Sequence, residues 1–241
     1  MKKVCIFIPA YNEEESIGTT IDEINKVTRN LKNYKFEVIV SNNNSKDKTG
    51  EIAKKHRARV VFEKKQGYGY AYKKGLSEAK GDIVITGDAD ATYPFSDIPR
   101  FLRVMEEGKY DLIIGNRFYN LDKKTMTLLN HFGNFLLTLA TNLIYGVKIN
   151  DSQSGMIAFN KNYLDKLNLD LLSNGMPLCQ ELKLYAICFG MKITEIPIIY
   201  RARIGKTKLK PLKDGLDNLI SLLKFKRKIQ KYITYLKNKN Q

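Results

Sequence analysis

Short apolar runs alternate with amphipathic segments along the first half of the chain. Runs rich in β-branched residues predict buried strands, and the mixed segments between them have the apolar spacing of helices. The predicted strands lie at 3–8, 36–41, 59–63 and from 83 onward, and the predicted helices run from the 11–16 segment to about residue 31, and over 49–56 and 72–79. Because strands and helices alternate, the pattern predicts an α/β fold with a mostly parallel sheet and helices on both of its faces.

The second half of the chain is less regular. Residues 128–145 place leucine and phenylalanine at helical spacing, with asparagine and threonine on a separate stripe. The other predicted elements are helices at 97–107 and 180–188 and strands at 111–115, 156–159 and 192–200. With 241 residues and 43% hydrophobic content, the chain is long enough to bury one large core.

Two aspartates follow the predicted strand that begins at Ile83. Asp88 and Asp90 are two positions apart, so on an extended backbone their side chains point the same way. Two carboxylates directed at one point repel each other unless a cation lies between them, and Mg²⁺ or Mn²⁺ is the natural candidate. Such an ion completes its shell with phosphate oxygens and water. The alternative is a turn with two solvated aspartates, because Asp-x-Asp alone is a weak signal.

Other small or polar residues follow the neighbouring strands. Ligands of parallel α/β sheets bind beyond the carboxyl ends of the strands, and Pro9, Asn42, Gly67 and Asp88 all fall there. The two glycines of the Gln66-Gly67-Tyr68-Gly69 stretch let the backbone approach a ligand closely. The sequence therefore predicts one binding site along this edge.

The composition indicates the cellular compartment and the kind of partner. The three cysteines have neither a disulfide framework nor a metal-ligand spacing, which favours a reducing cytoplasm. The first apolar run ends at Pro9, too early for a signal peptide, and no run approaches a membrane span. The formal net charge of +16 indicates a polyanionic partner: nucleic acid, an anionic membrane surface or a phosphorylated substrate.

Six motifs in register resemble the inverting family-two GT-A glycosyltransferases, and most closely the branch similar to dolichol-phosphate mannose synthase. The resemblance covers about residues 3–208, so we expect a GT-A (Rossmann-like) domain at 1–208 and a separate tail at 209–241. The motifs are Pro9-Ala10-Tyr11-Asn12-Glu13, Ser45-x-Asp47-x-Thr49, Gly67-x-Gly69-x-Ala71, Gly87-Asp88-Ala89-Asp90, Gly115-x-Arg117 and Asp151-x-x-Ser154-Gly155.

The resemblance implies roles for individual residues. Asp88 is expected near the ribose and the metal, and Asp90 as a direct metal ligand. Arg117 is expected to hold the acceptor phosphate, and Arg203 to clamp a phosphate as well, because the planar guanidinium grips two phosphate oxygens. The expected nucleotide-sugar residues are Pro9, Ala10, Tyr11, Glu13, Asn42, Gly67, Asp88 and Ala89, and the expected acceptor-phosphate residues are Arg117, His131, Ser154 and Arg203.

Two positions depart from the family pattern. Asn42 stands where the family commonly has an aspartate that accepts hydrogen bonds from the base, and an uncharged amide oxygen slightly favours a uridine donor over GDP-mannose. His131 stands where close relatives often carry an arginine. It either adds partial charge at the acceptor phosphate or only caps the polar stripe of its helix.

The implied reaction moves a hexose or N-acetylhexosamine from a nucleotide-diphosphate sugar to dolichyl or polyprenyl phosphate. A phosphate monoester is anionic at neutral pH and is its own nucleophile, so no catalytic base is needed. Glu181 falls where relatives with hydroxyl acceptors place a base, and we interpret it as structural or acceptor-lining. The alternatives are transfer to a saccharide or lipid hydroxyl and, in another class, a basic nucleic-acid-binding module, which the sugar-nucleotide motifs disfavour.

The last segment bears on location. Residues 206–241 hold eleven Lys and Arg residues against two acidic ones, with apolar residues at helical spacing among them. This composition suits amphipathic helices lying on an anionic membrane surface, and it also suits helices docked on the protein's own core. A lipid-linked acceptor favours the first interpretation, which predicts a cytoplasmic protein, peripheral on the cytoplasmic membrane face and without a transmembrane segment.

Overall fold

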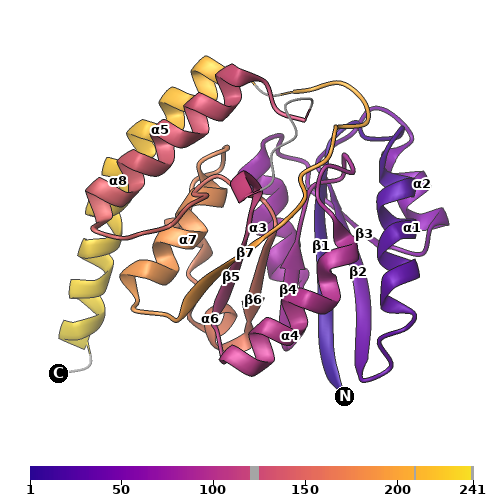
Figure 1. Ribbon diagram of the computed structural model, residues 1–241, viewed down its shortest axis with the longest axis horizontal. Helices are drawn as coiled ribbons and strands as arrows, with labels where there is room; N and C mark the ends of the chain where they lie inside the picture. The colour runs from indigo at the N-terminus through magenta and orange to yellow at the C-terminus, as the bar shows by residue number, and fades with distance from the viewer. Residues whose placement is uncertain (120–124, 209, 240–241) are drawn as a thin grey trace.

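The central strand, β1 (Lys2–Ala10), is buried on both faces. Val4, Ile6 and Ile8 face one layer of helices, and Cys5 and Phe7 face the other, all with 0% exposure. A strand that is apolar on both sides requires cover on both sides, which is why the sheet lies in the middle of the molecule (Figure 1). The computed structural model describes residues 1–119, 125–208 and 210–239.

The described strands form one seven-stranded sheet in the order β3-β2-β1-β4-β6-β5-β7. All run parallel except β6, which pairs antiparallel with both β4 and β5, so the expected mostly parallel sheet is confirmed. The remaining strands are β2 (Tyr34–Asn42), β3 (Arg59–Phe62), β4 (Ile83–Thr86), β5 (Leu112–Asn116), β6 (Ile157–Asn160) and β7 (Ile193–Pro197).

Helices cover both faces, as expected. Helices α1 (Ile17–Thr28), α2 (Thr49–Lys55) and α4 (Ile98–Gly108) contribute to the first core cluster. The second face is covered by α3 (Tyr68–Glu78), α6 (Lys161–Lys166), α7 (Leu178–Cys188) and α8 (Pro211–Lys239). Helix α5 (Leu128–Tyr145) lies beside α8 along one end of the molecule (Figure 1).

Several boundaries differ from the predicted ones. Helix α3 begins at Tyr68 rather than 72, directly after Gly67, whose φ of +148° is a conformation that favours glycine. Strand β7 ends at Pro197 rather than at residue 200, although Ile198 N still donates to Asn116 O of β5 at 2.9 Å. The tail is one continuous helix, α8, rather than several.

Candidate active site

The Tyr11–Glu14 loop and the Asn42–Thr49 turn are joined by hydrogen bonds at the carboxyl edge of the sheet. The backbone N–H of Asn12 donates to Ser45 Oγ at 3.0 Å, and that of Glu13 donates to Thr49 Oγ1 at 2.8 Å. Asn12, whose φ is +50°, also accepts a hydrogen bond through its side-chain Oδ1 from Lys46 N at 2.8 Å. These bonds fix two of the expected nucleotide-sugar segments against each other, next to Pro9 and Ala10 at the end of β1.

Asn42 has one amide contact within its own turn. Its Oδ1 accepts a hydrogen bond from Ser45 N at 3.0 Å, which leaves one oxygen lone pair for another donor. The neighbouring Asn43 joins the next strand: Oδ1 accepts from Gly67 N at 2.8 Å, and Nδ2 donates to Lys65 O at 2.7 Å. Asn43 therefore places Gly67 beside the turn, a contact that the sequence did not reveal.

Asp88 and Asp90 lie on the segment that leaves β4. Ala89 between them is buried, and its carbonyl oxygen accepts from Thr20 Oγ1 of α1 at 3.0 Å. Tyr68 donates its hydroxyl to Asp88 Oδ1 at 3.4 Å. Burial, and then the charge of Asp90, raises the pKa of the Asp88 carboxyl to about 7. A bound cation would reverse this effect, because it favours both ionised carboxylates.

The two carboxylates suit a hard cation that shares its shell with a substrate. No group of three or more His, Cys, Asp or Glu side chains in the described residues is arranged to hold a metal. Mg²⁺ characteristically binds one or two protein carboxylates and takes its other ligands from phosphate and water. In this structure a cationic side chain already contacts one of the two, since Arg203 Nη1 lies 2.7 Å from Asp90 Oδ2. Asp88 and Asp90 offer the type and number of ligands that such a divalent ion takes from a protein.

Arg117 follows β5 and is almost completely buried, with 6% of its surface exposed. Its Nε lies 2.8 Å from Asp151 Oδ2 and its Nη2 lies 2.9 Å from Asp151 Oδ1. Burial opposes ionisation of Asp151, but the guanidinium outweighs it and lowers the pKa of that carboxyl. The guanidinium also lies over the Tyr200 ring, 5.4 Å from its centroid. Arg117, the expected acceptor-phosphate ligand, thus forms a nearly buried ion pair with Asp151.

The Asp151–Gly155 turn connects Arg117 with the carboxylates. Gly155 N donates to Tyr93 Oη at 2.7 Å, and its carbonyl accepts from Thr86 Oγ1 of β4 at 2.9 Å. A Cβ on Gly155 would lie 3.5 Å from Asp88 Oδ1, so the turn passes directly beside that carboxylate. Ser154 is fully buried, and within the described residues its hydroxyl has no hydrogen-bond partner.

Lys183 of α7 was not anticipated from the sequence. It is fully buried, and its Nζ donates to the carbonyls of Ser152, Ser154 and Cys179 at 3.0, 2.6 and 3.2 Å. Burial lowers the pKa of its ammonium group. A single lysine within an apolar helical run was the only sequence signal, and it does not identify the carbonyls that the lysine binds.

His131 and Arg203 contact different residues of the site. His131, in the first turn of α5, packs edge-on against Phe118, with ring centroids 5.2 Å apart, which places it near Arg117. Its Nδ1 is buried without a hydrogen-bond partner among the described residues. Arg203 instead contacts Asp90 and Glu13, which are the residues expected to bind the metal and the nucleotide sugar. The two side chains therefore have different partners in the described residues, and their expected role at the acceptor phosphate stays a prediction.

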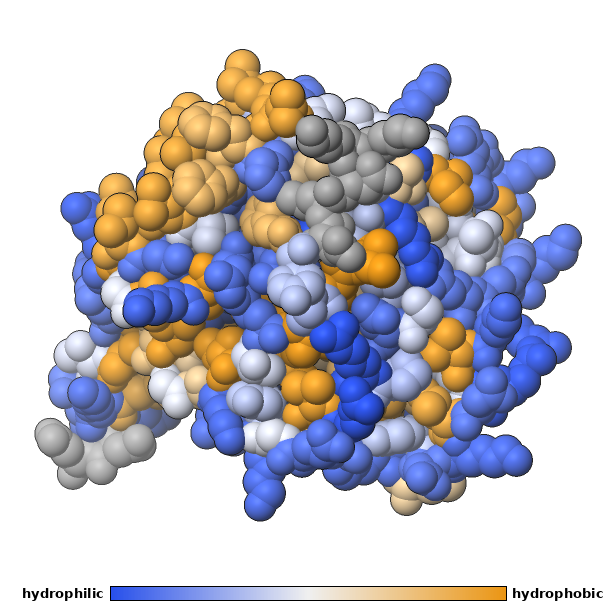
Figure 2. Space-filling model, viewed as in Figure 1, coloured by the Kyte–Doolittle hydropathy of each residue, from blue (hydrophilic) through white to orange (hydrophobic). Residues whose placement is uncertain are grey.

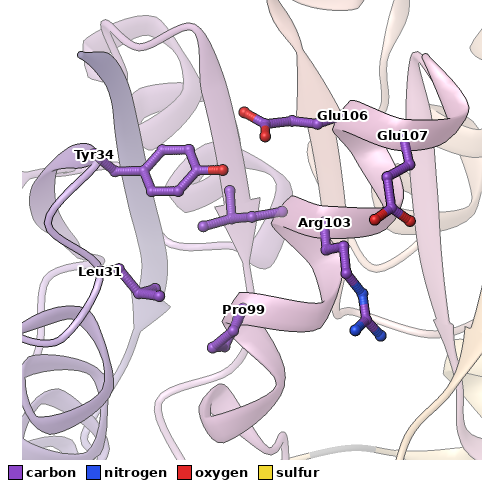
Figure 3. A pocket seen from close by; sticks show the side chains of 7 residues that line it. Leu31, Tyr34, Pro99, Arg103, Glu106 and Glu107 are labelled. Carbon is purple, nitrogen blue, oxygen red and sulfur yellow. The ribbon is translucent and has the colours of Figure 1, made fainter.

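A cavity of about 240 Å³ lies away from this site (Figure 3). Tyr34 at the start of β2 and Glu106 near the end of α4 line it, at the opposite edge of the sheet. None of the residues predicted for the site lines this cavity. The predicted site residues instead follow the strands at the carboxyl edge of the sheet, where parallel α/β sheets bind ligands.

The family model described as glycosyl transferase family 2 matches residues 5–167. A low-salt glycan biosynthesis hexosyltransferase, Agl6, of Haloferax volcanii is 34% identical over 87% of this chain, which spans only 50% of that protein. A dolichyl-phosphate hexose transferase of the same organism is 32% identical, covering 88% of this chain and 89% of the relative. A UDP-N-acetylglucosamine–dolichyl-phosphate N-acetylglucosaminyltransferase of Methanococcus voltae is 30% identical, with coverages of 82% and 85%.

Among solved structures, glucosyl-3-phosphoglycerate synthase from Mycobacterium tuberculosis, in complex with Mn²⁺, UDP and phosphoglyceric acid, superposes with a TM-score of 0.72. The alignment covers 93% of this chain and 77% of that one at 20% identity, which confirms the GT-A fold. The sequence motifs, the sheet order and the matched family agree. The chain belongs to glycosyl transferase family 2 and is a glycosyltransferase.

Proposed function

We propose that the enzyme transfers a hexose or N-acetylhexosamine from a nucleotide-diphosphate sugar to dolichyl or polyprenyl phosphate, with inversion at the anomeric carbon. The observation that carries the proposal is the Asp151–Gly155 turn, which passes beside Asp88 at one end and holds Arg117 at the other. A donor bound at the carboxylates and an anionic acceptor near Arg117 would then meet across this turn. Relatives named for dolichyl-phosphate sugar transfer support this acceptor.

The acceptor phosphate acts as the nucleophile. Its oxygen forms a bond to the anomeric carbon while the bond from that carbon to the diphosphate oxygen breaks, and the electron pair leaves with the nucleotide diphosphate. A divalent ion, Mg²⁺ or Mn²⁺, held by Asp88 and Asp90 would neutralise charge on the departing diphosphate. Arg117 and His131 attract the acceptor, and Pro9, Ala10, Tyr11 and Glu13 hold the nucleoside.

The environment of Glu181 argues against a hydroxyl acceptor. Glu181 is 2% exposed and accepts hydrogen bonds from Ser173 N at 2.6 Å, Ser173 Oγ at 2.5 Å and Ser221 Oγ at 2.6 Å. A general base must reach the proton that it removes. A carboxylate occupied by three internal donors is poorly placed for that role, so we assign Glu181 to the packing of α7.

We favour a UDP-sugar over GDP-mannose. Asn42 Oδ1 already accepts Ser45 N, so one lone pair remains for the base. Uracil presents a single ring N–H, whereas guanine presents an N–H and an amino group. A relative that uses UDP-N-acetylglucosamine and a structural neighbour bound to UDP agree with this choice.

We further propose that the enzyme works on the cytoplasmic face of an anionic membrane, with an apolar face formed by α5 and α8 turned toward the lipid. None of the helices in the described ranges combines the length and apolar content of a bilayer span. Figure 2 shows apolar side chains gathered over the end of the molecule where α5 and α8 lie. The exposed members are Leu128, Leu129, Phe132, Phe135, Leu136, Leu139 and Leu143 of α5, with Leu212, Leu216, Leu219, Ile220 and Leu223 of α8.

The test is a donor screen with a short polyprenyl phosphate. UDP-glucose, UDP-N-acetylglucosamine and GDP-mannose are each supplied with Mg²⁺ or Mn²⁺, and the lipid product is identified by mass spectrometry. We expect one UDP-sugar to give a lipid heavier by one sugar residue. The matched control is the same polyprenol without its phosphate, which we expect to remain unmodified. Transfer to the polyprenol, or to no phosphorylated lipid with any donor, would contradict the proposal.

A further inference from the structure

The segment that follows β7 crosses the candidate site as a cationic strap, defined here as residues 201–208. Its backbone runs beside the segment after β4, because Arg201 N donates to Thr92 O at 2.9 Å and Ile204 N donates to Asp90 O at 3.0 Å. Arg201 is anchored outside the site, on Glu23 of α1, through contacts of 2.8 and 3.1 Å. The strap is therefore fixed at Arg201 and continues over the carboxylates.

Two cationic side chains of the strap form ion pairs with the carboxylates of Glu13 and Asp90. The guanidinium of Arg203 bridges Glu13 Oε1 and Asp90 Oδ2, the latter at 2.7 Å. Lys208 Nζ lies 2.6 Å from the same Glu13 oxygen and donates to Asn12 O at 2.6 Å. The Glu13 and Asp90 side chains are only 9% and 5% exposed, so water cannot replace these partners without a change in the strap.

Both oxygens of Asp90 are already committed. Oδ1 accepts from Thr92 N at 3.1 Å and from Thr92 Oγ1 at 2.6 Å, while Oδ2 is paired with Arg203. The arginine itself is incompletely satisfied, since its Nε is buried without a partner among the described residues. A divalent ion that uses Asp90 Oδ2 must displace Arg203, and a displaced guanidinium needs another polyanion.

We propose that Arg203 is an exchangeable counter-ion, which occupies the carboxylate site in the absence of metal and moves to the donor's diphosphate when metal binds. Lys208 makes the same transfer from Glu13. Gly205, whose φ of +84° lies in the left-handed region, follows Arg203 and allows the strap to turn there. The proposal rests on the proposed function only for the identity of the donor as a nucleotide diphosphate.

The exchange makes the binding of metal and of nucleotide mutually dependent. Metal alone must break the Arg203–Asp90 pair without giving the guanidinium a new partner, so it binds weakly. With a nucleotide diphosphate present, the released guanidinium gains phosphate oxygens, so each ligand strengthens the binding of the other by the same factor. Removing the arginine should reduce this coupling, because the competing cation is then absent and only the direct contact between the metal and the diphosphate still couples the two ligands.

The first experiment measures Mn²⁺ binding from the electron paramagnetic resonance signal of free Mn²⁺, with and without UDP. For Arg203→Ala we expect Mn²⁺ alone to bind about tenfold more tightly than to the wild type, and the gain in Mn²⁺ affinity on adding UDP to be smaller than in the wild type. The matched control is Arg201→Ala, which removes an equally large cation of the same strap that pairs with Glu23 instead. Its Mn²⁺ binding should equal that of the wild type. Equal effects of both substitutions, or of neither, would overturn the exchange.

A second measurement uses the unaltered protein, so it does not depend on how well a variant folds. Hydrogen exchange of a peptide covering the strap should speed up when Mn²⁺ is added alone and slow down when UDP is added as well. Unchanged exchange with Mn²⁺, under conditions in which Mn²⁺ is bound, would overturn the proposal. Neither measurement involves transfer to a lipid, so a failure of the proposed acceptor would leave both results unaffected.

Discussion

Asp90 is the residue on which the metal-dependent mechanism depends most directly. We expect Asp90→Asn to lower kcat at least about a hundredfold, because the substitution removes a charge that holds the cation at the leaving diphosphate. The fold should persist, since the amide can still accept from Thr92. The measurements are steady-state transfer and far-ultraviolet circular dichroism.

Asp165 supplies the control for that substitution. It is exposed on α6, and its ion-pair partner is Lys161 of the same helix, at 3.9 Å, rather than a residue of the site. Asp165→Asn should retain wild-type kcat. Full activity of Asp90→Asn, or of the wild type in excess chelator, would remove the metal from the mechanism.

A substitution of Arg117 tests whether this residue binds the acceptor phosphate. Arg117→Lys keeps a cation beside the buried Asp151 but replaces the two-pronged fork with a single ammonium group. We expect KM for polyprenyl phosphate to rise about tenfold, which corresponds to about 1.4 kcal/mol, while KM for the donor changes less than twofold. An equal rise in both constants would place Arg117 on the nucleotide instead.

The Arg117–Asp151 pair also makes stability depend on pH. The pKa of Asp151 is lowered in the folded protein, so the pair stabilises the fold above the ordinary aspartate pKa of about 3.9 and is lost as the pH falls through the lower folded value. Urea unfolding between pH 6 and pH 2 should show this loss in the wild type. Asp151→Asn should be less stable at pH 6 and show a shallower decline toward acid, whereas Asp165→Asn should follow the wild type.

Individual positions of these residues were predictable, but their partners were not. Asp90 and Arg117 each follow a strand, so the strand pattern alone placed both at the carboxyl edge. Asp151 is 34 residues from Arg117, and Arg203 is 113 residues from Asp90. Such pairs depend on how β6 and the strap return to the sheet, which local periodicity does not determine. The roles of these residues in transfer remain proposals.

At the scale of elements, α7 and α8 are joined by buried polar contacts. Ser221 of α8 donates to Glu181, and Gln180 Nε2 donates to Asn218 O at 2.9 Å. Because Glu181 is assigned to packing, Glu181→Gln should lower the free energy of unfolding by about 1–3 kcal/mol and leave kcat within about threefold. Chemical denaturation and transfer kinetics measure the two effects. A loss of activity of about a hundredfold or more in a folded variant would identify Glu181 as a general base and restore the hydroxyl-acceptor alternative.

The elements were predictable where apolar periodicity is long and undisturbed. Helix α5 spans the predicted 128–145, and β5 and β6 are shifted by one residue from their predicted bounds. The pattern gave no indication of α6, a helix of six residues, because one and a half turns carry almost no periodic signal. Nor did it reveal that β6 runs antiparallel, since strand direction depends on the connection and not on the strand's own residues.

At the scale of the molecule, α8 both packs on the core and borders the apolar face. Leu222, Phe225 and Ile229 are buried in the second core cluster, so removal of the helix would damage the fold as well as any lipid contact. The interpretation of the tail as a helix docked on the core therefore holds for one side of α8, and contact of its exposed side with a membrane stays a prediction. The membrane contact must be tested with substitutions on the exposed side alone.

Leu143 of α5 and Leu216 of α8 are 76% and 58% exposed and belong to the apolar face. We expect Leu143→Ser with Leu216→Ser to weaken binding to vesicles of phosphatidylcholine and phosphatidylglycerol (7:3) about thirtyfold, because each leucine contributes about 1 kcal/mol by partial burial in lipid. Co-sedimentation measures binding, which should also fall as salt screens the lysines of α8 beyond about 8 Å. Phe62→Ser, at an equally exposed site on the edge strand β3, is the control and should bind like the wild type. The alternative is that the apolar face joins two copies of the chain, which light scattering on the wild type and the double variant tests. If the wild type is a dimer, the double variant is a monomer and this variant still binds vesicles normally, the face joins two copies and lipid contact must lie elsewhere.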